Sequence, residues 1–167
     1  MVEIRRAMPD DAEKILEYCK IIGGETENLT FGSEGVSFTL EQEQEYLERI
    51  LRSDRQIYLV AVDDEEVVGT AVFEAYGRPR LAHRGEISIS VKKSMWGNHI
   101  GTRFMEEIIY FAKTPAHIEI ISLEVRSDNE RAISLYKKFG FEKIGTFHGF
   151  LKINGADIDC DIMTLHL

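Results

Sequence analysis

A short stretch in the middle of the chain combines glycines, nearby cations and the expected start of a helix. Residues 95–104 read MWGNHIGTRF and include no acidic side chain, although the 167-residue chain has a formal net charge of −9. A glycine-containing turn that begins a helix exposes backbone N–H groups at the positive end of the helix dipole. Lys92, Lys93 and Arg103 add positive charge around this turn. The stretch therefore predicts an anion site that favours a phosphate-bearing ligand.

Alternating and helical hydrophobic patterns surround this turn and must position it. Strand patterns with a period of two occupy residues 2–6, 56–62, 67–76, 85–91, 118–125, 141–153 and 156–167. Apolar residues at helical spacing occupy residues 9–20, 40–53, 100–112 and 128–140. This order predicts a single α+β domain over residues 1–167, with about seven strands and about four helices.

Local signals mark several boundaries between these elements. Thr39 and Gln42 form a capping-box pattern at the start of the second helix, and Asn154-Gly155 predicts a tight turn in the last hairpin. Residues 21–38 contain four glycines and no helical period, so we expect a long loop there. Long loops within a compact domain are often functional.

A second motif follows the expected strand at 118–125. Residues 129–141 read NERAISLYKKFGF, and together with the turn at 96–101 they resemble the GNAT superfamily of acyl-CoA-dependent N-acyltransferases. Motif B of that superfamily is N-x-x-A-x-x-L-Y-x-x-x-G-F. Every marked position is met, by Asn129, Ala132, Leu135, Tyr136, Gly140 and Phe141.

Motif A of the same superfamily is [QR]-x-x-G-x-[GA], and its loop wraps the pyrophosphate of coenzyme A. In this sequence Trp96 stands at the Gln/Arg position, His99 at the first glycine and Gly101 at the last position. Trp96 and His99 therefore depart from the pattern. The order of the elements agrees with the superfamily along nearly the whole chain.

The resemblance implies a mixed central sheet that is splayed between its fourth and fifth strands, and acetyl-CoA as co-substrate without a metal. Pantetheine is expected to pair with the backbone near Ile89 and Val91, while Asn129 and Tyr136 contact the cofactor. The residues implied to bind the pyrophosphate are Trp96, Gly97, Asn98, His99, Ile100, Gly101 and Thr102. The implied reaction is acetyl transfer to a primary amine by direct attack within a ternary complex.

Two catalytic roles follow from this chemistry. A protonated alkyl amine has no lone pair to offer, so a general base is needed. Glu86 is the first candidate because it lies on the polar face of the fourth strand, and Glu124 or a relaying water is the alternative. Tyr136 matches the superfamily tyrosine that is assigned to protonating the leaving thiolate.

The acceptor is expected to bind near the 21–38 segment and the second helix, where the superfamily varies to build its acceptor site. Glu25, Glu27 and Glu34 could attract an amine cation, and the candidate substrate contacts are Glu25, Glu27, Phe31 and Glu124. A small amine, an amino acid and a protein amino terminus all stay open as acceptors. A noncatalytic acyl-CoA-binding regulatory module is the alternative function.

Composition sets outer limits on partners and location. The 20 basic residues against 29 acidic ones argue against nucleic-acid binding. No stretch approaches the ~20 apolar residues that span a bilayer, and the amino end lacks an apolar signal region, so we expect a cytoplasmic protein. Cys19, Cys160 and the scattered histidines suggest neither a metal site nor a disulfide. Exposed strand edges make a homodimer plausible.

Overall fold

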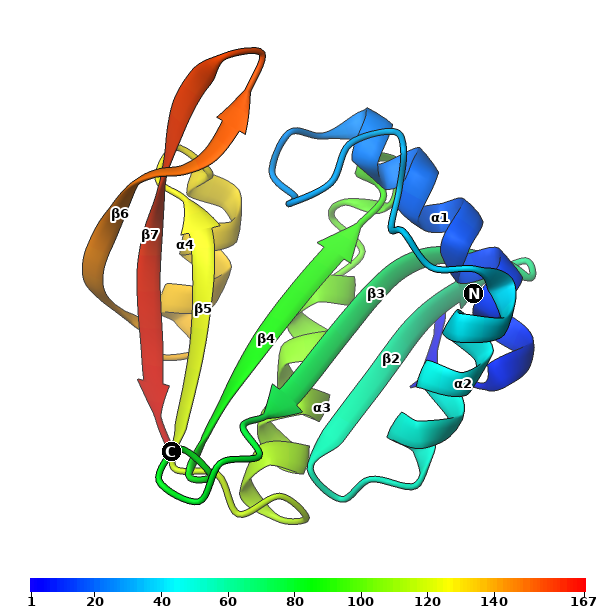
Figure 1. The fold of residues 1–167 in the computed structure, drawn as a ribbon, viewed down its shortest axis with the longest axis horizontal. Helices are drawn as coiled ribbons and strands as arrows, with labels where there is room; N and C mark the ends of the chain where they lie inside the picture. The colour runs from blue at the N-terminus through cyan, green and yellow to red at the C-terminus, as the bar shows by residue number, and fades with distance from the viewer.

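The computed structural model describes all residues, 1–167, and contains one seven-stranded mixed sheet in the order β1-β2-β3-β4-β5-β7-β6 (Figure 1). The strands are β1 (Glu3–Arg6), β2 (Gln56–Asp63), β3 (Glu66–Ala75), β4 (Arg84–Val91), β5 (Ile120–Arg126), β6 (Glu142–Ile153) and β7 (Ala156–His166). The helices are α1 (Ala12–Glu25), α2 (Leu40–Leu51), α3 (Ile100–Lys113) and α4 (Glu130–Lys138), with short 3₁₀ turns η1 (Pro9–Asp11) and η2 (Lys93–Met95). The predicted α+β fold is confirmed.

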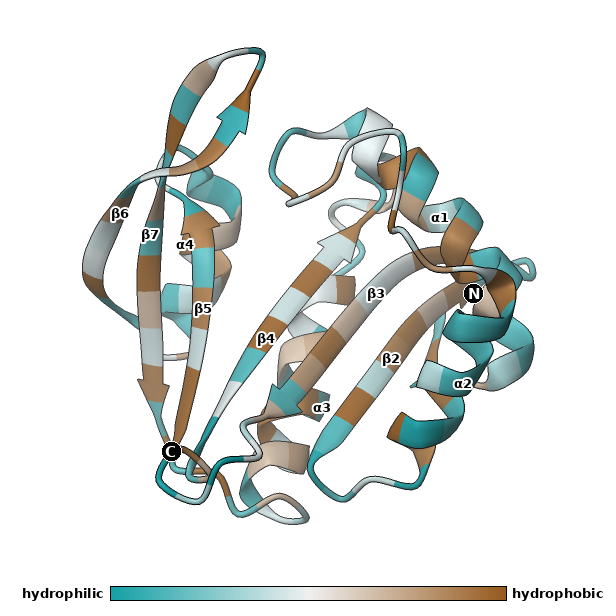
Figure 2. Ribbon diagram, viewed as in Figure 1, coloured by the Kyte–Doolittle hydropathy of each residue, from teal (hydrophilic) through white to brown (hydrophobic).

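Helices cover both faces of the sheet and create two hydrophobic cores. One core joins α3 and α4 to the sheet through residues such as Phe104, Ile108 and Leu123, and the other joins α1 and α2 to it through Tyr18, Leu47 and similar residues. Figure 1 shows α3 behind β3 and β4, and Figure 2 shows hydrophobic β2 and β3 beside a largely hydrophilic α2. The amphipathic periods of the sequence therefore direct each helix onto its own face of the sheet.

The sheet splays between β4 and β5, as the resemblance implied. These two parallel strands pair only over residues 84–86 and 120–122, and beyond that point they diverge (Figure 1). The Lys92 N–H donates to the Val68 carbonyl at 2.9 Å, at the end of the antiparallel β3–β4 ladder. Because ladder bonds alternate along an antiparallel strand, the backbone groups of Ile87, Ile89 and Val91 point away from β3, toward the splay.

The first helix ends later in the structure than the sequence predicts. Helix α1 continues through Glu25, so only the later part of the predicted 21–38 loop is irregular. Gly23, one of the glycines that suggested a loop, serves packing in the helix instead, because a Cβ on it would lie 1.9 Å from the Gly32 carbonyl oxygen. The returning segment therefore lies directly against the end of α1.

The other local predictions are confirmed. Thr39 and Gln42 form the reciprocal capping box at the start of α2, and Asn154 and Gly155 both have positive φ in the last hairpin. No helix has the length and apolar character needed to cross a membrane.

Candidate functional site

The turn between β4 and α3 presents a run of available backbone N–H groups. The N–H groups of Gly97, Asn98 and His99 donate no hydrogen bond within the chain. The first hydrogen bond of α3 is donated by the Arg103 N–H to the His99 carbonyl at 3.0 Å. The N–H groups of residues 100–102, in the first turn of the helix, therefore have no carbonyl acceptor within the chain. Six consecutive N–H groups, at residues 97–102, are thus available to an anion.

Backbone conformation explains why this motif favours glycine. Gly97 has φ 85°, and His99, the N-cap of α3, has φ 58° in the left-handed region. A side chain at such a position costs roughly 1–2 kcal/mol relative to glycine. His99 adopts the required conformation despite its side chain, which is exposed to solvent.

Trp96, the other departure from motif A, connects three elements. Its indole N–H donates to the Val91 carbonyl at 3.1 Å, and the Arg131 guanidinium lies over its ring at 4.3 Å. Lys93 Nζ lies 6.0 Å from the same ring. Trp96 therefore joins the end of β4 to the start of α4 and holds two cations beside the anion-binding turn.

A cavity of about 650 Å³ extends from this turn along the open edge of β4. Its walls include nearly all of the predicted cofactor residues: Ile89, Val91, Trp96, Gly97, His99, Ile100, Gly101, Thr102, Asn129 and Tyr136. Asn98 is absent from the walls, and its side-chain amide donates to the Met95 carbonyl at 3.0 Å. The structure thus brings together the residues of both motifs in one cavity.

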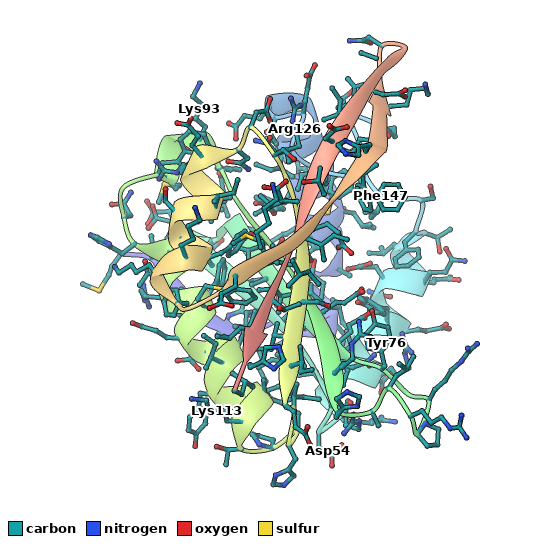
Figure 3. All side chains as sticks on the ribbon, turned by 90° about the vertical axis from the view of Figure 1, so that its left-hand side faces the viewer. Asp54, Tyr76, Lys93, Lys113, Arg126 and Phe147 are labelled. Carbon is teal, nitrogen blue, oxygen red and sulfur yellow. The ribbon has the colours of Figure 1, made fainter.

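Two residues predicted for the acceptor line this first cavity. The Glu25 carboxylate accepts from the Lys93 N–H at 2.7 Å, and the Glu27 carboxylate lies 3.7 Å from the Arg126 guanidinium. Figure 3 shows Lys93 and Arg126 toward the same end of the molecule. These glutamates join the end of α1 to the elements that surround the splay.

A second cavity, of about 620 Å³, lies under α2 and across the polar faces of the central strands. Phe31 and Glu124, the other predicted acceptor contacts, line it. Residues shared by the two cavities are Asn28, Leu29, Ile89, Ser90, Asn129, Ala132 and Tyr136. The cavities therefore meet at the splay, beside Tyr136.

Tyr136 is held as a protonated phenol at this junction. Its side chain is buried against Phe141, with ring centroids 5.8 Å apart, and its hydroxyl makes no hydrogen bond within the chain. Burial raises the pKa of Tyr136 to about 12. A tyrosine in this state is able to donate its proton to a developing anion.

The two candidate bases have different surroundings. Glu86 is exposed, accepts a hydrogen bond from the Tyr76 hydroxyl and lines neither cavity. Glu124 is also exposed, but it lines the second cavity, where partial burial and then the neighbouring Glu86 carboxylate raise its pKa. Figure 3 shows Tyr76 well away from Lys93 and Arg126. Of the two, only Glu124 borders the space that reaches Tyr136.

Further site residues were missed in the sequence analysis. Ser90 lines both cavities, and its hydroxyl lies 3.0 Å from the Tyr18 hydroxyl and 3.1 Å from that of Thr70. Arg131 was missed although it follows Asn129 closely within motif B. Ser90 carried only a weak signal, its place on the polar face of β4.

The two cysteines, Cys19 and Cys160, have buried and unpaired thiols. Burial raises the pKa of each thiol, to about 11 for Cys19. The thiolate form that acts as a nucleophile is therefore disfavoured at both positions. No group of three or more His, Cys, Asp or Glu side chains is arranged to hold a metal ion.

Comparison with known sequences identifies relatives of this chain. The model of the family described as acetyltransferase (GNAT) matches residues 25–141. The L-amino acid N-acetyltransferase AaaT of Escherichia coli is 36% identical over 106 residues, covering 63% of this chain and 65% of that protein. The N-alpha-acetyltransferase RimI of Mycobacterium tuberculosis is 31% identical over 109 residues, covering 65% and 66%. The chain thus matches slightly less than two thirds of each relative's length.

Solved structures share the whole fold. A GNAT-family acetyltransferase from Streptococcus pneumoniae superposes with a TM-score of 0.96, at 28% identity and with 100% of both chains covered. The yncA protein of Salmonella typhimurium, described with its cofactor acetyl-CoA, has a TM-score of 0.84 at 20% identity, with 99% of this chain and 94% of that chain covered. The second likeness shows the fold alone.

Proposed function

Because the chain belongs to the GNAT family of acetyltransferases, we propose that it transfers an acetyl group from acetyl-CoA to a primary amine. The observation that carries this proposal is the meeting of two cavities at Tyr136, one bordered by the anion-binding turn and the other by Glu124. Each substrate would approach the splay from its own cavity. Such an arrangement favours direct attack within a ternary complex.

The residues of the first cavity fit acetyl-CoA. The N–H groups of residues 97–102 suit the pyrophosphate, since they have no acceptor within the chain and lie at the positive end of the α3 dipole. Lys93 and Arg131 supply further positive charge. The backbone of Ile89, unpaired on the side of the splay, suits the amides of an extended pantetheine arm.

The chain's own groups supply the proton transfers of the reaction. The attacking amine forms the new C–N bond to the acetyl carbon as the C–S bond breaks, and the amine proton passes to a base. We assign that base to Glu124, directly or through water, because its raised pKa lies closer to neutrality than that of an ordinary glutamate. Tyr136 donates its proton to the departing sulfur, and the Ile89 N–H is our candidate donor to the carbonyl oxygen.

The relatives suggest the range of acceptors. One is described as an L-amino acid N-acetyltransferase and the other as an N-alpha-acetyltransferase. We propose a small-molecule or peptide amine that enters the second cavity. A cytoplasmic location and a homodimer stay predictions from the sequence.

The test is amine-dependent thiol release from acetyl-CoA, measured with a panel of amines. We expect turnover by the wild-type protein and a fall in kcat of ~10²-fold in Tyr136→Phe, the size typical of a lost general acid. Tyr110→Phe is the matched control, because Tyr110 lies on α3 and is 66% exposed. Coenzyme A affinity measured by calorimetry should stay close to that of the wild type in both variants.

Two results would contradict the proposal. Tight coenzyme A binding without thiol release for any amine would favour a noncatalytic acyl-CoA-binding module. An undiminished kcat in Tyr136→Phe would remove the acid role from this residue.

A further inference from the structure

A buried glutamate lines the second cavity at the end farthest from the splay. Glu43 lies on α2, and only 3% of its surface is exposed. It occupies a position on the apolar stripe of α2, between Leu40 and Leu47, where a hydrophobic residue would pack without a desolvation cost. A carboxylate at this position therefore requires an explanation other than packing.

Glu43 has no polar partner within the chain. Its carboxylate accepts no side-chain or backbone hydrogen bond and forms no ion pair, although no buried polar atom of the protein is both sealed from solvent and unpaired. The carboxylate oxygens therefore keep some access to solvent, and Glu43 lines the second cavity. Tyr58, 8% exposed, lines the same cavity, and its hydroxyl is likewise without a partner. Two unpartnered polar groups thus converge on one end of the cavity.

The register of the sheet fixes how far these groups lie from the splay. Tyr58 pairs with Val72 and Val72 pairs with Ser88, so the three residues form one row across β2, β3 and β4. Neighbouring strands lie about 4.8 Å apart, which places Tyr58 about 10 Å from the Ser88 backbone on β4. The amine nitrogen that attacks the acetyl group at the splay is therefore too far away to contact Glu43 as well.

The walls between the two ends are mainly aromatic and apolar. The rings of Phe38 and Tyr46 pack edge to face with their centroids 5.9 Å apart, and the rings of Tyr46 and Tyr58 do so with their centroids 6.2 Å apart. Val72 and Phe31 complete this part of the lining. Such walls suit an aliphatic chain, and aromatic rings also stabilise a nearby cation.

We propose that Glu43, with Tyr58, binds a second cationic group of the acceptor, so that the preferred substrates are diamines, polyamines or amines with a basic side chain. This inference rests on the proposed acetyl transfer and names the class of its acceptor. The aliphatic part would lie along Phe31, Phe38 and Tyr46. Glu43 would then be a specificity-determining residue at a distance from the reacting atoms.

Other charged groups of the cavity agree with this assignment. Glu74 accepts from the Tyr46 hydroxyl at 2.7 Å and adds negative charge near the aromatic wall. Arg126 is paired with Asp128 at 2.8 Å, so its charge is largely neutralised. Arg49 also lines this cavity, and its guanidinium lies over the Tyr46 ring at 5.3 Å, without an ion pair to Glu43. The end of the cavity at Glu43 is therefore the site for a cation.

The test compares cadaverine with pentylamine, which has the same carbon chain but one amino group. We expect kcat/KM to be at least ~10-fold higher for cadaverine, the ratio expected for one hydrogen bond to a charged group. Glu43→Gln keeps the side-chain shape and should bring the ratio close to one, and Tyr58→Phe should lower it. Glu45→Gln, on the exposed face of α2, is the matched control and should keep the wild-type ratio.

A binding measurement separates this inference from the proposed function. Calorimetry of cadaverine and pentylamine with the coenzyme A complex should show the same preference, lost in Glu43→Gln. If no amine supports thiol release, the proposed function fails, and the binding preference still decides the inference. Equal affinity and equal kcat/KM for the two amines in the wild-type protein, or a preference that survives Glu43→Gln in a folded variant, would overturn it.

Discussion

Glu86 and Glu124 illustrate how position within the splay separates two similar side chains. Both lie on polar faces of adjacent strands, and Glu86 pairs in register with Ser122, one alternation before Glu124. Both side chains are exposed, but Glu86 accepts a hydrogen bond from the Tyr76 hydroxyl, whereas Glu124 lines the second cavity. Partial burial and the neighbouring Glu86 carboxylate raise the pKa of Glu124. The raised pKa makes Glu124 a stronger base than an ordinary glutamate.

The pH profile of kcat/KM provides a test of this assignment. A base acts in its deprotonated form, so activity should fall as the pH decreases through the raised pKa of Glu124. Glu124→Gln should lower kcat/KM by ~10²-fold and abolish this acidic limb. Glu86→Gln should move the limb to lower pH, because it removes the negative charge that helps to raise the pKa of Glu124. Loss of the limb in Glu86→Gln but not in Glu124→Gln would assign the base to Glu86.

At the scale of elements, the turn from β4 into α3 is the structure on which cofactor binding depends. Strand β4 ends with backbone groups facing the splay, and the left-handed His99 then redirects the chain so that six N–H groups precede the first bond of α3. Gly101 contributes differently, because a Cβ there would lie 3.1 Å from Leu135 Cδ2 of α4. A substitution at Gly101 would therefore test the packing of α3 against α4 as much as cofactor binding.

Replacement of His99 tests the turn more directly. His99→Val places a β-branched residue at φ 58°, which should destabilise the fold by about 1 kcal/mol and reduce coenzyme A affinity roughly tenfold as the N–H groups reorient. His99→Gly is the control, since glycine adopts this conformation freely and should preserve the affinity. Calorimetric titration with coenzyme A measures the affinity of both variants. Wild-type affinity in a folded His99→Val variant would contradict the assigned role of the turn.

At the scale of the whole molecule, the site lies between two parts of one sheet. Strands β1 to β4 form one part, and β5, β7 and β6 form the other, with the β6–β7 hairpin extending beyond the rest (Figure 1). Asp161 on β7 stabilises the second part, because its carboxylate accepts from Ser127 at 2.7 Å, Lys143 at 3.0 Å and Thr146 at 3.1 Å. This network connects β7 with β6 and with the segment that leads into α4, which bears Tyr136.

Acid should weaken this network. The Ser127 hydroxyl, together with Lys143 and Thr146, holds the pKa of Asp161 below its usual value. Its contribution to stability is therefore complete above the unfolded-state pKa and is lost as the pH falls through the lower folded-state pKa. Asp161→Asn should reduce the free energy of unfolding by about 2 kcal/mol at neutral pH, and by progressively less in acid.

Denaturant unfolding across pH measures this difference. Asp157→Asn is the control, because Asp157 is about two-thirds exposed and pairs only with the exposed Lys152. A deficit in Asp161→Asn that does not shrink in acid would show that the carboxylate charge is not its cause.

The sequence by itself determined the order of the elements and most of the residues of the two motifs that line the first cavity. Hydrophobic period, the Thr39 capping box and the Asn154-Gly155 turn are local signals, and each acts through residues close in sequence. Both motifs are also short segments, so the residues around His99 and Asn129 were identified before their contact was known. The α1 boundary was misjudged because Gly23 serves a contact with the distant Gly32.

Only the tertiary structure decided which glutamates face which space. Glu25 and Glu27 line the first cavity, Glu86 lies outside both cavities, and Glu124 lies inside the second. Glu43 appeared in the sequence only as a charged residue on an apolar stripe, and its partnerless burial depends on β2 and α1 packing against α2. The desolvation and neighbouring charge that shift the pKa of a side chain come from residues far apart in the chain, so no local pattern specifies them.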